Sequence, residues 1–195
     1  FMGWWQADLM VNEMANRKPL IICIIGESGS GKTTLADYIE ENYAIPSIKS
    51  YTDRPRRTQD EQGHTFLTKD EYTNLVGNKI AFCEFGGYRY CSLESDVREE
   101  NVYVIEEGGY LLLLANYRDK YRIKSIRVKC DEVIRRMRVG QDRVNRDKGK
   151  FTLEDKYFNF VINTTNSEIG DYPLLEEKIL QWTNRGWYSN EEYGK

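Results

Sequence analysis

A short glycine-rich segment between two different hydrophobic patterns is the strongest constraint on how this chain folds. Residues 20–25 read Leu-Ile-Ile-Cys-Ile-Ile, a continuous β-branched run typical of a strand that is covered on both faces. After the glycines, Leu35, Tyr38 and Ile39 fall on one side of a helix predicted over 33–43. Strand, glycine loop and helix in this order predict the first unit of a parallel α/β fold.

The loop itself matches a phosphate-binding pattern. Gly26-Glu-Ser-Gly-Ser-Gly31-Lys32-Thr33 has two glycines five positions apart, followed by lysine and threonine. Such glycines let successive N–H groups turn toward phosphates, the lysine reaches the β and γ oxygens, and the hydroxyl binds Mg²⁺. A purely structural glycine turn is the alternative, and the flanking strand and helix argue against it. The sequence therefore predicts an ATP and Mg²⁺ site, with Lys32 catalytic, built from Gly26, Glu27, Ser28, Gly29, Ser30, Gly31, Lys32, Thr33 and Thr34.

The remaining elements alternate between strands and helices. Further strands are predicted at 79–85, 88–91, 102–105, 123–128 and 160–162, the first two joined by a Gly86-Gly87 turn. Helices are predicted over 69–77, where Thr68 and Glu71 suggest a capping box, and over 92–99, 109–117, 131–146 and 172–184. We expect a single domain over 19–195 with a mainly parallel sheet wrapped by helices and a small antiparallel insertion, after an extension or tag-like segment at 1–18.

The amino-acid composition argues against several classes of protein. The chain has one histidine and four widely spaced cysteines, which argues against zinc sites and redox dithiols. Its longest apolar run has six residues, and no secretory leader is recognisable, so we expect a cytoplasmic protein without a membrane partner. At 195 residues it suits one domain, acting as a monomer or dimer.

Charge is concentrated in one block. Residues 118–150 hold thirteen lysines and arginines against five acids, a balance of +8 in a chain of net charge −3. Such a block suits either a nucleic-acid surface or a site for an anionic small molecule.

Two segments resemble the guanylate kinase family. Ser50-Tyr-Thr-Asp-Arg54-Pro-Arg56-Arg57, followed by Gly63-His64-Thr65-Phe66, is similar to that family's acceptor segment, and residues 84–92 are similar to its nucleotide-binding hairpin. The resemblance spans roughly 19–185 and implies a P-loop NTPase fold. It also implies an acceptor phosphate held by Arg54, Arg57 and Tyr90, with Ser50 and Ser92 addressing the base. Guanidinium groups suit a phosphate because they bind it bidentately and stay charged.

The chain departs from the family at two places, one in the acceptor segment and one in the hairpin when the hairpin is matched without gaps. His64 stands nearest to the usual phosphate-binding tyrosine, and a phosphate contact by His64 is one of two alternatives, an exposed loop histidine being the other. Ala81 takes the place of the guanine-reading glutamate, and Glu84, three positions on, is the nearest acid. GMP or dGMP is therefore the favoured acceptor, with another or a modified nucleotide as an alternative.

The basic block resembles the helical lid of nucleoside monophosphate kinases. The resemblance places the lid at about 131–150 and implies that Arg136, Arg143 and Arg146 close over the triphosphate; a solvated helix with salt bridges is the alternative. Glu106 follows a strand where related enzymes place an acid for the metal. Asn163 resembles the asparagine of the adenine-side loop.

These observations favour an ATP-dependent nucleoside monophosphate kinase that needs no general base, because its acceptor is already an anion. One alternative is a kinase for a small phosphorylated metabolite or for a nucleobase in DNA. Another is a non-catalytic, peptide-binding guanylate-kinase-like module, against which Lys32 and Thr33 argue. Nucleic-acid binding through the basic block is the weakest alternative.

Overall fold

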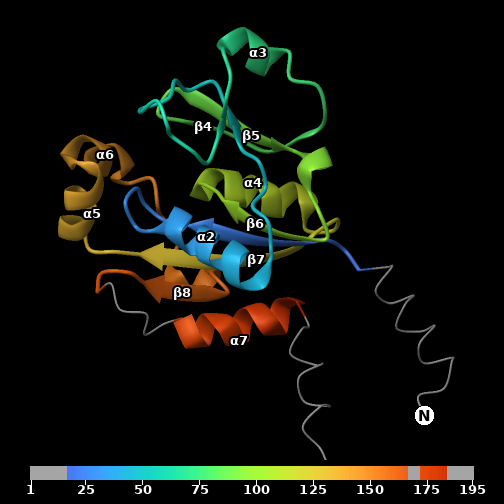
Figure 1. Cartoon of the computed structure of the whole chain (residues 1–195), viewed down its shortest axis with the longest axis vertical. Coiled ribbons are helices and arrows are strands. Elements are labelled where there is room, and N and C mark those ends of the chain that lie inside the picture. Colours follow the sequence, from blue (N-terminus) through green and yellow to red (C-terminus); the bar gives the residue numbers. More distant parts are fainter. Residues whose placement is uncertain (1–16, 167–171, 184–195) are drawn as a thin grey trace, which may run out of the picture.

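A four-stranded parallel sheet forms the centre of the protein (Figure 1). The computed structural model describes residues 17–166 and 172–183, so most of the predicted extension at 1–18 lies outside the described residues. The strand order is β6 (Glu100–Val104), β1 (Leu20–Ile25), β7 (Arg122–Lys129) and β8 (Phe160–Asn163). All six residues of β1 are buried, as the continuous apolar run predicts.

Helices cover both faces of this sheet, and the alternation of β1 divides the core between them. Its even-numbered residues, from Leu20 to Ile24, pack with residues of α2 (Lys32–Tyr43) and α7 (Tyr172–Thr183). The odd-numbered residues, from Ile21 to Ile25, pack with α4 (Glu107–Tyr117). Because successive side chains of a strand point to opposite faces, one strand supplies both cores.

A second, smaller sheet lies above the first in Figure 1 and carries the predicted hairpin. Its order is β3 (Thr65–Phe66), β2 (Tyr51–Thr52), β5 (Tyr88–Leu93) and β4 (Lys79–Phe85), and β4 and β5 pair antiparallel across Gly86 and Gly87. Both glycines have positive φ, which a two-residue hairpin of this kind requires. Helix α3 (Lys69–Thr73) begins with the predicted capping box of Thr68 and Glu71.

Two helix predictions are wrong. The predicted helix at 92–99 is instead the end of β5, a single 3₁₀ turn at Glu94–Asp96 and the approach to β6, because Ser92 and Leu93 pair with Ile80 and Lys79 of β4. The predicted helix at 131–146 is two helices, α5 (Glu132–Val139) and α6 (Gln141–Asp147), broken at Gly140, whose φ of 82° and ψ of 159° cannot continue a helix. We call α5 and α6 the lid helices.

Two further features complete the architecture. The strands β2 and β3 were not predicted, since two residues show no periodicity. The segment around Ser47 also bridges to Val102, which extends the edge of the main sheet beyond β6. No helix in the described ranges is long and apolar enough to cross a bilayer.

Candidate active site

The glycine loop, residues 26–33, connects β1 to α2 and is shaped by close backbone packing. Gly29 and Gly31 have φ of 79° and 96°, in the left-handed region that favours glycine. A Cβ on Gly26 would lie 2.4 Å from the carbonyl oxygen of Val128, so only glycine fits there. The amine of Lys32 folds across its own loop and donates to the carbonyl oxygens of Gly26 (2.7 Å) and Glu27 (3.1 Å).

An open cleft of about 440 Å³ runs from the glycine loop to the small sheet. This volume lies in the range of small-molecule sites. Its lining includes many of the residues predicted from the sequence: Ser28, Lys32, Thr33, Ser50, Arg57, His64, Tyr90, Glu106, Arg143 and Arg146. Segments far apart in the chain therefore meet in one space.

Glu106 lies at the end of β6 with its carboxylate close to Lys32. Burial raises the pKa of Glu106, although Lys32 opposes this effect. Burial also lowers the pKa of Lys32, against the opposing charges of Glu106 and Asp147. One carboxylate oxygen of Glu106 is buried and has no hydrogen-bond partner in the described structure. This unpartnered carboxylate oxygen of Glu106, next to Lys32, is therefore available to bind a ligand.

The oxygen atoms that Thr33 and Glu106 offer suit magnesium better than zinc. Thr33 and Glu106 both line the cleft and offer oxygen atoms, the ligand type that Mg²⁺ prefers. The described residues contain no group of three or more His, Cys, Asp or Glu that could hold a metal ion. Mg²⁺ is commonly held by one or two protein oxygens together with substrate phosphates, so the residues present fit this ion.

The acceptor segment is organised by a residue that the sequence analysis missed, Glu61. Its carboxylate accepts hydrogen bonds from the guanidinium groups of Arg54 (2.8 and 3.2 Å) and Arg57 (3.3 Å) and from the backbone N–H of Arg57 (2.7 Å). Arg54 is 4% exposed and is not among the residues that line the cleft, whereas Arg57 is. Arg57 therefore faces the open space and Arg54 supports it through Glu61.

His64 packs between aromatic rings at the same end of the cleft. Its ring meets those of Tyr90 and Phe66 edge to face, with centroids 5.7 and 5.8 Å away. Burial and the nearby Arg54 lower the pKa of His64 to about 4, so the imidazole is neutral at physiological pH. Its Nδ1 atom is buried without a partner in the described part of the chain. The ring thus keeps one polar atom uncommitted.

The residues expected near the base divide into two groups. Ser50 and Ala81 line the cleft, and Ala81 has a φ of 51° within the irregular pairing of β4 between Ile80 and Cys83. Ser92 is fully buried outside the lining and donates to the carbonyl oxygen of Lys49 (2.6 Å). Glu84 is exposed on β4, also outside the lining. The structure therefore brings neither Ser92 nor Glu84 to the cleft.

The lid helices meet the glycine loop through arginines, but only partly through those predicted. Arg143 and Arg146 line the cleft as expected. Arg136 is outside it and pairs with Glu132 (2.7 Å) one turn away. Arg135 and Arg138, which were not proposed as lid contacts, instead reach the loop, at the carboxylate of Glu27 (3.2 Å) and the carbonyl oxygen of Gly29 (3.0 Å).

The end of β8 touches the loop beside the predicted Asn163. The Asn163 side chain accepts the N–H of Thr165 (2.9 Å) and lies outside the cleft lining. Its neighbour Thr164 donates to the carbonyl oxygen of Ser30 (2.6 Å). Thr164, directly after β8, therefore links the end of this strand to the glycine loop.

A buried carboxylate at the start of α4 ties down the chain that follows the lid. Glu107 accepts from the backbone N–H groups of Thr152 (2.8 Å) and Leu153 (3.1 Å), and from the hydroxyl of Thr152 (3.0 Å). Arg127 donates to its other oxygen (3.3 Å). Glu106 and Glu107, adjacent in sequence, thus serve the cleft and the lid connection respectively.

Comparisons with known proteins identify the fold. No protein-family model matches the chain, and no curated protein matches it in sequence. Among solved structures, a guanylate kinase from Anaplasma phagocytophilum aligns with a TM-score of 0.57 at 19% identity, covering 86% of this chain and 87% of that one. The chain has the guanylate kinase fold.

Two other solved structures align with TM-scores of 0.41. They are an uncharacterized protein from Eubacterium ventriosum (15% identity, covering 83% of this chain and 98% of that one) and a sugar kinase from a Janibacter species (12%, 85% and 95%). The guanylate kinase fold confirms the predicted α/β architecture with a central parallel sheet flanked by helices.

Proposed function

We propose that this protein is an ATP- and Mg²⁺-dependent kinase that phosphorylates nucleoside or deoxynucleoside monophosphates, with GMP and dGMP as the first candidates. One observation carries the proposal. A single cleft has the glycine loop with Lys32 at one end and Arg57, His64 and Tyr90 at the other. The guanylate kinase fold supports the same interpretation.

At the triphosphate end, Lys32, Arg143 and Arg146 supply positive charge around the transferred group. Phosphoryl transfer spreads negative charge over the equatorial oxygens, so cations fixed before the reaction lower its barrier. Thr33 and Glu106 would hold Mg²⁺, which neutralises charge on the phosphate oxygens. Burial lowers the pKa of Lys32, while Glu106 and Asp147 favour its charged form.

At the acceptor end, Arg57 binds the acceptor phosphate together with Tyr90 and the neutral His64. Arg54 has a positioning role in this proposal, because its guanidinium is committed to Glu61. No group has to remove a proton, since the attacking phosphate is already ionised. Alignment of the two phosphates and neutralisation of their charge together supply most of the rate enhancement.

The part of the cleft expected to hold the nucleobase, near Ser50 and Ala81, determines how strictly the enzyme selects its base. Ser50 lines it, but Ala81 stands where a guanine-reading carboxylate is expected and brings no charge. A carboxylate left without donors is costly, by about 1–3 kcal/mol or more, which is how such a group rejects the wrong base. We therefore expect a guanine preference that is weaker than such a carboxylate would impose.

The test is a coupled ADP-release assay with MgATP and each common NMP and dNMP. We expect turnover with one or more of them, removed by Lys32→Ala and retained by Lys69→Ala, whose exposed side chain lies on α3 away from the cleft. Absence of turnover with every nucleotide would overturn the proposal, and so would undiminished turnover in Lys32→Ala.

A further inference from the structure

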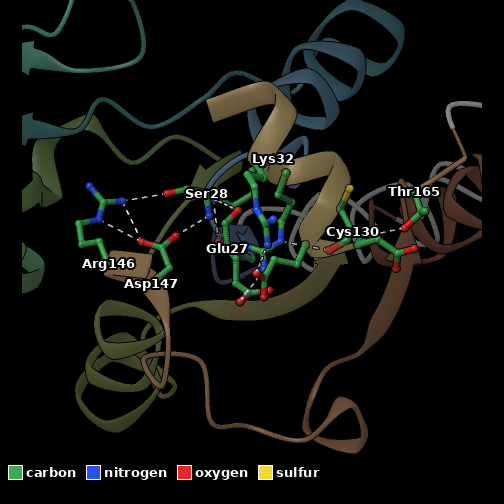
Figure 2. Close-up of polar contacts among 12 residues, drawn as sticks. Glu27, Ser28, Lys32, Cys130, Arg146, Asp147 and Thr165 are labelled. Carbon is green, nitrogen blue, oxygen red and sulfur yellow. Dashed lines mark hydrogen bonds and ion pairs between the residues drawn. The ribbon is translucent and has the colours of Figure 1, made fainter. Parts of the chain in front are cut away.

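Three groups close a ring between the glycine loop and the end of α6. The backbone N–H of Ser28 donates to Oδ2 of Asp147 (2.6 Å), and the Nε and Nη2 atoms of Arg146 donate to Oδ1 (3.0 and 2.9 Å). The Nη2 atom of Arg146 also donates to the hydroxyl of Ser28 (2.8 Å). Figure 2 shows both lid residues on one side of Ser28, with their contacts converging on it. The end of α6 therefore touches the loop through two adjacent residues.

Asp147 is well suited to hold a cation in place. It is 1% exposed. Burial alone would raise the pKa of Asp147, but hydrogen bonds from Ser28 and Arg146 outweigh this effect and hold the pKa below its ordinary value. A buried carboxylate with this many donors stays ionised and has little freedom to rotate.

Arg146 also reaches the acceptor side of the molecule. Its guanidinium carbon lies 4.8 Å from the ring centre of Phe85, at the end of β4. Its Cδ atom lies beside the hairpin turn, 3.6 Å from where a Cβ on Gly86 would be. One guanidinium thus contacts the glycine loop and the hairpin of the small sheet at once.

We propose that Asp147 is a positioning residue, which fixes the Arg146 guanidinium at the junction of the triphosphate and acceptor ends of the cleft. The inference rests on the proposed function. Arg146 is long and flexible, and without a fixed partner it would sample many rotamers. The carboxylate holds it where charge develops in the transition state and where the two substrates meet.

The first test compares Asp147→Asn with Asp142→Asn. We expect Asp147→Asn to lower kcat about 100-fold with KM values changed less than about threefold, because misplacing a charge affects the transition state more than binding. Asp142 is an exposed acid on the same helix, outside the cleft, and serves as the matched control with unchanged kcat. An unchanged kcat in Asp147→Asn overturns the proposal.

Chemical rescue separates positioning from a merely structural role. In Arg146→Ala, added guanidinium ion at millimolar concentration should restore part of the lost kcat, because the Asp147 carboxylate still binds a guanidinium. The double variant Arg146→Ala/Asp147→Asn should show no rescue, whereas Arg146→Ala/Asp142→Asn should be rescued like the single variant. Equal rescue in all three proteins overturns the proposal even where Asp147→Asn is poorly folded.

A third measurement does not depend on activity. The Arg146 Nε–H group should give a protected proton signal in ¹H–¹⁵N spectra of the intact protein, lost in Asp147→Asn and kept in Asp142→Asn. A wild-type protein with this signal and without kinase activity would refute the proposed function and leave the contact standing. An active wild type whose signal is unaffected by Asp147→Asn would refute the positioning role alone.

Discussion

The Glu61 carboxylate offers the sharpest test of how the acceptor end is built. Glu61 sits between Arg54 and Arg57, and its side chain is 17% exposed. Replacing it by glutamine keeps its shape and removes its charge. The variant leaves the 4%-exposed Arg54 without its ionic partner. We expect Glu61→Gln to destabilise the protein and to weaken acceptor binding.

The expected magnitude follows from the pKa of Glu61. Burial alone would raise this pKa, but hydrogen bonds from Arg54 and Arg57 lower it from the ordinary 4.5 to about 2. A lowered pKa stabilises the folded state above pH 4.5, and this contribution disappears as the pH falls toward 2. The difference corresponds to about 3 kcal/mol at neutral pH. Solvent screening reduces this contribution, because the Glu61 side chain is 17% exposed and that of its partner Arg57 is 38% exposed.

Urea unfolding at pH 7, 5 and 3 measures this contribution. We expect Glu61→Gln to lower the free energy of unfolding by about 1–3 kcal/mol at pH 7, with a gap that narrows toward pH 3. Asp60→Asn, an exposed neighbour, is the matched control and should change stability by less than about 0.5 kcal/mol. Equal stability of wild type and Glu61→Gln at pH 7, or a gap independent of pH, would refute the ion-pair reasoning.

Other substitutions test the two ends of the cleft. Arg57→Ala should raise the acceptor KM about tenfold or more while leaving the calorimetric Kd of MgATP unchanged; a weakened MgATP complex would reverse the assignment of the ends. Glu84→Gln should leave the ratio of kcat/KM among the four dNMPs unchanged, because this side chain is outside the cleft. Gly26→Ala should lower stability by about 2 kcal/mol or more in thermal unfolding, because its Cβ would meet the Val128 carbonyl oxygen. EDTA should abolish turnover and excess Mg²⁺ restore it.

Local sequence signals predicted the elements that local physics determines. The run at 20–25 is a fully buried strand and the Gly86-Gly87 pair is a hairpin turn, and the residue pattern that signals each of them lies within a few consecutive positions. The helix predicted at 92–99 failed because Ser92 and Leu93 find partners on β4, a contact with no local signature. Tertiary pairing overrode a weak helical pattern.

The candidate site likewise contains residues that a local motif predicted and residues that only tertiary contacts reveal. The sequence places Lys32 beside Arg143 and Arg146 through motif and charge, and the structure brings all three to one cleft. Gly140 breaks the lid helix, so the face of α5 that meets the glycine loop carries Arg135 and Arg138 rather than Arg136. The carboxylates that hold these cations were missed because each was one acid among many.

The adjacent acids Glu106 and Glu107 restrict insertions and deletions at the junction of β6 and α4. One carboxylate belongs to the cleft and the next anchors the chain at Thr152 and Leu153. Adding or deleting a single residue between β6 and α4 would move Glu106 relative to the cleft or Glu107 relative to Thr152, because the first is placed by the end of β6 and the second by the start of α4. Length variants at this junction should therefore be poorly tolerated.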